Sequence, residues 1–154
     1  MTTAHEARTV VRIRLEGNAP LDAQGQPVPL RWQNEDGEPL PDDPAPFVYT
    51  EVLTGRAALA GFGGGRGNNL YRNPLLVDVY VFVPKGEGLD QAEQIAEQIA
   101  VLFRSYRDDV VSLFDATVYP GGDGADLKPP GLTSEVGNYA YCAVEVTGHF
   151  DQIG

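Results

Sequence analysis

A glycine-rich stretch from Gly61 to Gly67 is the part of this chain that comes nearest to a chemical motif. Glycine loops can cradle phosphates, but the phosphate-binding loop also needs a Gly-Lys-Ser/Thr sequence, and the two lysines are Lys85 and Lys128. The dinucleotide-binding pattern fails as well, because Arg66 holds its third glycine position and no predicted helix follows. We therefore interpret the stretch as a hairpin loop that becomes ordered on contact with another subunit. Its candidate anchors are Arg56, Phe62 and Arg66.

Residues that bind metals are few and scattered. His5 and His149 lie near opposite ends of the chain, and the single cysteine, Cys142, lies on the apolar face of a predicted strand. No transition-metal site is expected from this spacing, and Cys142 is interpreted as a small core residue. The acidic residues of segment 35–43 offer oxygen ligands, but the prolines among them disfavour a tight cation loop, so we expect solvated side chains.

Acyl-transfer chemistry has no recognisable nucleophile here. Ser105, Ser112 and Ser134 all lack the Gly-x-Ser-x-Gly context that raises a serine on a tight turn. A pair of carboxylates working as acid and base stays open, because the sequence does not show their separation in space. No catalytic residue and no cofactor are predicted. A small enzyme or ligand-binding domain with a pocket under the glycine loop remains an alternative function.

Composition favours one folded domain spanning residues 1–154. A hydrophobic content of 42% is enough to form a core, and a chain of 154 residues is too short for two substantial cores. Acidic residues outnumber basic ones 22 to 11, and a net charge of -11 opposes binding to a phosphate backbone. One cysteine excludes an intramolecular disulfide, and no apolar run approaches the ~20 residues that cross a bilayer. The start lacks the succession of a signal peptide, so synthesis in the cytoplasm and no membrane partner are expected.

The long apolar segment from Leu75 to Val83 predicts a central strand, because apolar side chains point to both of its sides and only Asp78 interrupts them. A short turn follows, and Asp90 is predicted to cap a helix whose capping box Glu93 completes. One apolar stripe at helical spacing supports that helix; it consists of Ala92, Ile95, Ala96, Ile99, Leu102, Phe103 and Tyr106.

The remaining periodic segments complete a sheet with helices. Residues 4–16 fit either a helix or a strand, and we favour the helix, on which Arg8, Arg12 and Arg14 form a solvated or subunit-facing surface instead of a nucleic-acid site. Strands are predicted at about 30–34, 47–54, 110–119 and 139–150, and extended loops at about 35–46, 55–71 and 120–137. The fold class predicted is α+β, with a mixed or antiparallel β-sheet of about four to five strands and two helices packed on one face.

A succession of features runs from about Leu30 to Tyr106. It consists of the Trp32-Gln33-Asn34 strand end, a proline-rich segment, the Phe47-Val48-Tyr49 strand, a glycine-bearing loop, Arg72 before a long apolar strand, the turn from Val83 to Gly88 and an Ala/Ile-rich helix. This order resembles the tail terminator-like proteins of tailed bacteriophages. The Pro-x-Gly-x-Gly turn before the helix is the most specific part of the resemblance.

The resemblance implies a small α/β protein that assembles as a hexameric ring on the head-proximal end of the tail tube. Such a ring ends tube polymerisation and gives the head connector or stopper protein a docking surface. DNA would pass through its channel without specific binding, which suits an acidic protein. The location implied is the tail or neck of the virion, after synthesis in the host bacterial cytoplasm. Another neck protein, a stopper or head completion protein, is the alternative. The expected interface residues are Arg56, Phe62, Arg66, Tyr71 and Arg72.

Overall fold

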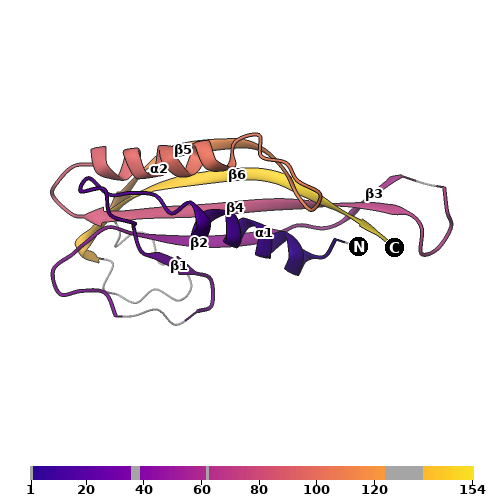
Figure 1. Cartoon of the computed structure of the whole chain (residues 1–154), viewed down its shortest axis with the longest axis horizontal. Helices are drawn as coiled ribbons and strands as arrows, with labels where there is room; N and C mark the ends of the chain where they lie inside the picture. The colour runs from indigo at the N-terminus through magenta and orange to yellow at the C-terminus, as the bar shows by residue number, and fades with distance from the viewer. Residues whose placement is uncertain (1, 36–38, 62, 124–136) are drawn as a thin grey trace.

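The computed structural model of the chain describes residues 2–35, 39–61, 63–123 and 137–154. These residues form one mixed six-stranded sheet with two helices on one face, which confirms the predicted α+β class (Figure 1). In chain order the elements are α1 (Ala4–Gly17), β1 (Leu30–Trp32), β2 (Phe47–Thr54), β3 (Ala58–Gly61), β4 (Leu70–Pro84), α2 (Asp90–Phe103), β5 (Ser112–Asp123) and β6 (Tyr139–Ile153).

The predicted central strand is the centre of the sheet. The order is β1-β2-β4-β6-β5, and β3 pairs with the beginning of β4. β4 is antiparallel to β2, from Phe47 opposite Phe82 to Thr54 opposite Leu75, and antiparallel to β6 along its whole length. β5 is antiparallel to β6, and the short β1 is parallel to β2. The sheet therefore has a rigid middle, and its edges are β1, β3 and β5.

The main core lies between the helices and the sheet. Alternate residues of β4, from Leu75 to Val83, have at most 2% of their surface exposed and face the helices. α1 is confirmed as a helix, because Thr3 and Glu6 form a reciprocal capping box and Ala7, Val11 and Leu15 enter the core at helical spacing. Burial of a Val or Leu side chain contributes about 1.5–3 kcal/mol, so this core makes a large contribution to stability.

The start of α2 differs from the prediction. Asp90 is the first residue inside the helix, and the N-cap is Leu89, which has no side-chain hydrogen bond to the helix end. The reason is that Leu89 already has helical dihedral angles, so the carboxylate of Asp90 lies beyond the capping position. Asp90 and Glu93 still lie in the first turn, where the helix dipole favours negative charge.

Among the described residues no helix covers the other face of the sheet, and a second buried cluster lies at one end of it. Phe47, Tyr49, Phe82 and Tyr139 form an aromatic cluster there, with the Phe47 and Phe82 rings stacked at 4.7 Å between centroids. Leu40 packs against this aromatic cluster. The predicted extended loop at 35–46 is thus attached to its own sheet through Leu40, and its residues 36–38 lie outside the described residues.

Three strand limits also differ from the prediction, and the simplest is that β6 runs to Ile153, three residues beyond its predicted end. β5 begins at Ser112 and continues to Asp123, so the first four residues of the loop predicted at 120–137 belong to this strand. Pro120 is opposite Cys142 and Asp123 is opposite Ala140, while residues 124–136 lie outside the described part. β1 ends at Trp32, two residues before the predicted limit, because Asn34 takes a left-handed conformation with φ of 57°.

The basic group on α1 contacts its own subunit while Arg8 remains exposed, so its solvated or subunit-facing role stays a prediction. Arg8 donates to the carbonyl of Val52 at 3.3 Å, and Arg12 pairs with Glu16 and Glu35. Arg14 donates to the carbonyl of Leu102 at 2.8 Å, and its guanidinium lies 3.7 Å from the centre of the Tyr106 ring. These contacts fix α1 to the sheet and to α2.

Candidate assembly surface

β2 and β3 follow one another along β4, and one interruption of the pairing lies between them. A second register shift lies within β3, between Leu59 and Gly61. Pairing with β4 runs to Thr54 opposite Leu75, Gly55 N donates to the carbonyl of Pro74 at 3.1 Å, and pairing resumes at Ala58 opposite Arg72. The chain advances four residues from 54 to 58 while β4 changes by three, from 75 to 72. The extra residue makes this interruption a β-bulge. Pro74 explains its position, because proline has no N–H to give to the ladder.

The bulge marks the base of a projection that we call the hairpin arm, residues 56–72, of which residue 62 is not described. The hairpin arm extends beyond the helices at one end of the molecule (Figure 1). Gly65 and Gly67 have φ of 71° and 90°, and Asn68 N donates to the carbonyl of Gly65 at 3.1 Å, so a compact turn reverses the chain. The loop predicted at 55–71 is therefore wrong in extent: 58–61 and 70–71 belong to strands.

A third strand supports the base of the hairpin arm. Tyr71 is opposite Gln152, and Leu70 is opposite Ile153 in β6. Asn69 and Gly154 exchange both backbone hydrogen bonds, at 3.1 and 3.0 Å. The hairpin arm is thus a continuation of the central sheet, which gives it a defined direction in space.

The outer edge of the hairpin arm is open. Within the described residues β3 pairs with β4 on one side and with no strand on the other. Ala58, Leu59 and Ala60 are all exposed, and Leu59 leaves 43% of its surface in solvent. An unpaired strand edge beside exposed apolar side chains is a template for pairing with another chain.

Most of the predicted interface residues come together on the hairpin arm. Arg56 lies in the bulge and Arg66 in the turn; both are exposed, and neither forms an ion pair with any described residue. Tyr71 is half-buried in β4. Arg72 has a partner of its own, since its guanidinium donates two hydrogen bonds of 2.9 Å to Asp151. Phe62 lies outside the described residues.

The hairpin arm is basic although the protein is acidic. No aspartate or glutamate occurs between Glu51 and Asp78, a span that contains Arg56, Arg66 and Arg72. Asp151 of the neighbouring strand offsets Arg72, and the hydrogen bonds from Arg72 lower the pKa of Asp151 below its ordinary value. The hairpin arm therefore presents an apolar edge and two guanidinium groups that have no ion pair among the described residues. Such a surface suits an acidic and apolar partner surface.

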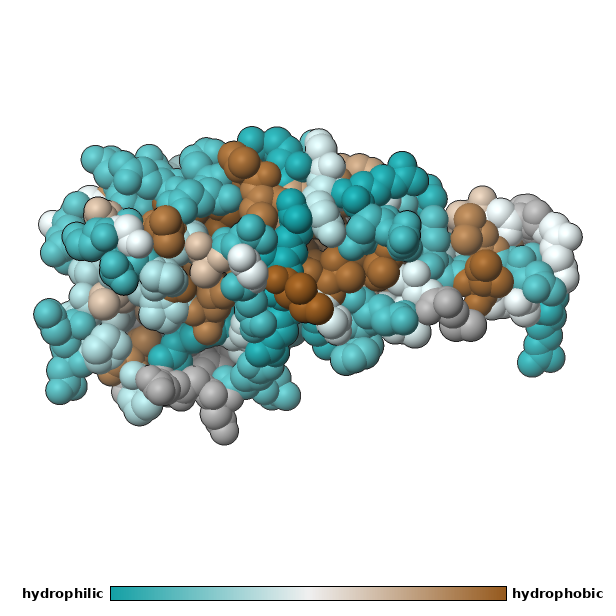
Figure 2. Space-filling model, viewed as in Figure 1, coloured by the Kyte–Doolittle hydropathy of each residue, from teal (hydrophilic) through white to brown (hydrophobic). Residues whose placement is uncertain are grey.

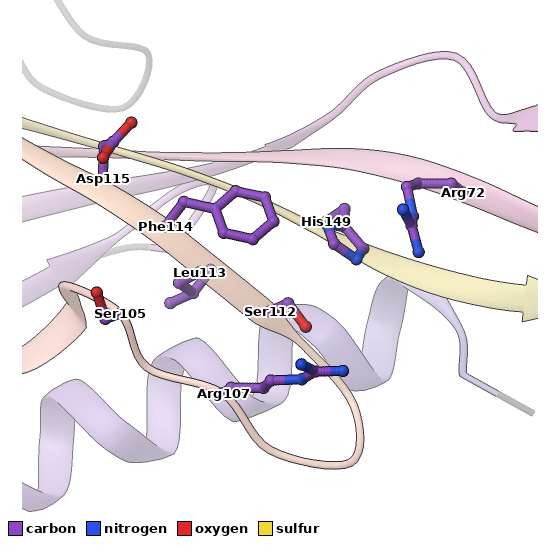
Figure 3. Close-up of a pocket in the computed structure, with 8 residues that line it drawn as sticks. All are labelled: Arg72, Ser105, Arg107, Ser112, Leu113, Phe114, Asp115 and His149. Atoms are coloured by element: carbon purple, nitrogen blue, oxygen red, sulfur yellow. The ribbon is translucent and has the colours of Figure 1, made fainter. Parts of the chain in front are cut away.

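A groove of about 530 Å³ lies at the base of the hairpin arm (Figure 3). Arg72, Arg107 and His149 line it beside Ser105 and Ser112. Burial and the charge of Arg72 lower the pKa of His149, so the ring is neutral at neutral pH. Among the described side chains no hydrogen bond connects His149 to either serine, and the pairing that activates a serine nucleophile is not formed.

The sequence did not draw attention to Leu59, Ile153 or Asp151. Leu59 stands among small residues, and Asp151 and Ile153 are distant in sequence, so their place beside the hairpin arm follows only from the pairing of β4 with β6. Cys142 is buried, and its surroundings raise the pKa of the thiol, which confirms its interpretation as a core residue. In the described ranges no three metal-binding side chains converge, and no helix is long and apolar enough to span a bilayer.

Comparison with known proteins gives the fold alone. No protein-family model matches the chain, and no curated protein matches it. One solved structure, of a protein whose name states no function, superposes with a TM-score of 0.51 at 17% sequence identity. The two chains share a fold. The superposition covers 96% of each chain, so the shared fold extends over nearly the whole of both.

Proposed function

We propose that this protein is a structural subunit of a bacteriophage tail that joins copies of itself into a ring. The hairpin arm carries the proposal, because it extends the central sheet beyond the core and keeps an unpaired strand edge in solvent. In a single subunit this projection leaves apolar surface exposed to solvent, which is unfavourable. Assembly would bury Leu59 and pair the strand edge.

The resemblance of the sequence to tail terminator-like proteins suggests where in the phage tail this ring lies. In this proposal about six copies close on the head-proximal end of the tail tube, stop tube growth and offer the opposite side to the head connector. The net charge of -11 per chain suits a channel through which DNA passes without binding, because like charges repel the phosphate backbone. The protein is structural in this proposal and performs no reaction.

Particles that lack the protein test the proposal. Electron microscopy should show tails longer than normal and variable in length, because nothing ends the polymerisation of the tube. Tails of normal length beside heads that have lost their DNA would contradict the terminator and support a stopper or head completion protein in its place.

A variant in the hairpin arm tests whether this part of the structure is needed for termination. Arg66→Glu changes an exposed side chain in the turn, so the subunit should keep its fold and its melting temperature. Ring formation should fall, and tails should lengthen as in particles without the protein. Unchanged tail length and infectivity with Arg66→Glu would contradict a role for the hairpin arm in termination.

A further inference from the structure

An apolar pocket lies at the end of the molecule opposite the hairpin arm. It has a volume of about 290 Å³, and we call it the proline pocket. Its lining residues are Pro29, Leu30, Arg31, Pro39, Leu40, Pro41, Ala45, Pro46 and Phe47. Leu40 and Phe47 belong to the packing of the aromatic cluster, so the floor of the proline pocket is held by the folded sheet.

Two carboxylates stand beside the proline pocket. Asp42 and Asp43 are exposed and lie in the chain between the lining residues Pro41 and Ala45. Neither forms an ion pair with a described residue. The whole segment 35–46 contains five acidic residues and no basic residue. Arg31 also lines the proline pocket, and its guanidinium lies 5.4 Å from the centre of the Phe47 ring. With Asp42 and Asp43 beside it, the border is acidic on balance, whereas the hairpin arm is apolar with basic side chains.

These two surfaces cannot meet within one subunit. Phe47, in the proline pocket, pairs with Phe82 of β4, and Arg72, in the hairpin arm, lies ten residues earlier in the same strand. At ~3.3 Å per residue the two positions are about 33 Å apart along a rigid strand. Figure 2 shows apolar surface on the hairpin arm at one end, and the segment around Phe47 lies at the other end in Figure 1.

We propose that the hairpin arm of one copy docks on the proline pocket of the next copy. Leu59 enters the proline pocket, and Arg56 and Arg66, on either side of it in the chain, meet Asp42 and Asp43. This inference rests on the proposed function and names the partner surface for the ring. Because each copy uses different surfaces at its two ends, the contact is head-to-tail and repeats until a ring closes.

Charge explains why this contact is selected. Each chain carries a net charge of -11, so most orientations of two copies bring like charges together. The hairpin arm carries Arg56 and Arg66 and the proline pocket lies beside Asp42 and Asp43, and none of the four forms an ion pair with another described residue. Their attraction favours this one orientation and weakens as salt screens it.

Charge reversal on each surface tests the contact. Arg56→Glu/Arg66→Glu makes the hairpin arm acidic, and Asp42→Lys/Asp43→Lys makes the border of the proline pocket basic. Each variant alone should associate at least about tenfold more weakly than the wild type in sedimentation velocity, because its two surfaces then repel each other. An equimolar mixture should assemble again, since each variant's hairpin arm now complements the other's proline pocket.

Control variants carry one charge reversal of each sign elsewhere, and the two combined reverse as many side chains as each test variant. Arg107→Glu and Asp109→Lys alter exposed side chains outside both surfaces and should change association less than about twofold. Circular dichroism verifies the fold of every variant. If a reversed variant unfolds, the neutral Arg56→Gln/Arg66→Gln and Asp42→Asn/Asp43→Asn variants replace it, with a smaller loss of association expected.

The outcomes separate the docking from the proposed function. Loss in each variant and recovery in the mixture support the docking. Wild-type assembly that both reversed variants retain would overturn the docking and leave the ring intact. A wild-type protein that stays monomeric at every concentration would overturn the ring and the docking together.

Discussion

Asp78 lies directly opposite Glu145 where β4 pairs with β6, and Glu51 faces Asp78 from β2 on its other side. All three carboxylates are half-buried on the sheet face opposite α1 and α2. Burial raises the pKa of Asp78 above its ordinary value, and Glu145 and Glu51 raise it further. The row of like charges therefore works against folding at neutral pH.

Removing the middle charge should stabilise the subunit. Asp78→Asn keeps the shape of the side chain and ends its repulsion with Glu145 and Glu51, so the free energy of unfolding at pH 7 should rise by roughly 0.2–1 kcal/mol. Urea denaturation measures this change. Asp109→Asn, which removes one exposed charge from a turn, serves as the control and should leave stability unchanged.

The stability gain of Asp78→Asn over the wild type should depend on pH. The pKa of Asp78 is raised in the folded state, so this residue stabilises the fold at pH values below its pKa in the unfolded chain. The contribution is lost as the pH rises through the pKa of the folded state. The stability difference between Asp78→Asn and the wild type should thus be present at neutral pH and shrink in acid below the ordinary pKa of 3.8. A difference that grows on acidification would contradict the assignment.

Arg72 should hold Asp151 ionised. Replacing it by glutamine removes the two hydrogen bonds of 2.9 Å, so the pKa of Asp151 should rise towards its ordinary value of 3.8 in an NMR titration. Because the pKa of Asp151 is lowered in the folded state, this residue stabilises the fold at pH values above its pKa in the unfolded chain, and the contribution is lost as the pH falls through the pKa of the folded state. The stability that Arg72→Gln loses relative to the wild type should therefore be larger at neutral pH than in strong acid. An unchanged pKa of Asp151 would show that the pair does not persist in solution.

Ser105 follows the end of α2 in a left-handed conformation, with φ of 55°. Its backbone N–H donates to the carbonyl of Phe114 at 3.0 Å, which keeps the strained geometry in place. Ser105→Gly should raise the free energy of unfolding by up to ~1 kcal/mol, because glycine adopts this conformation without a clash of its side chain. Ser105→Ala keeps the Cβ atom and should give no such gain in thermal or urea unfolding.

Gly148 permits the close approach of β5 to β6. A Cβ atom there would lie 2.4 Å from the carbonyl oxygen of Ser112 and 2.7 Å from Leu113 Cδ2. Gly148→Ala should therefore destabilise the protein by about 1–3 kcal/mol, through displacement of the strand. Gly17→Ala, where a Cβ meets nothing within 4 Å, is the matched control, and an equal loss in both variants would contradict this reason.

The local patterns of the sequence predicted the elements well. The apolar run of β4 and the stripe of α2 specify their own structure, because burial on one face or on both is visible in the alternation of residues. β3 could not be predicted in this way. Its Ala-Leu-Ala sequence has no strand pattern of its own, and it becomes a strand because β4 continues past the bulge at Pro74.

The candidate assembly surface was predicted in part. Arg56 and Arg66 were identified from their place around the glycines, and the structure places both on the hairpin arm without an ion pair among the described residues. The partner of Arg72 was not visible, because Asp151 is 79 residues away in the chain. The proline pocket was missed for a similar reason: it forms only when Pro39 and Leu40 fold back towards Phe47.

The copy number of the purified wild-type protein, measured by native mass spectrometry as its concentration rises, tests the central claim most directly. The proposed ring predicts that monomer converts into one closed species, of six copies according to the resemblance, with no larger masses. A protein that remains monomeric up to its solubility limit, or that grows without a fixed size, would contradict it.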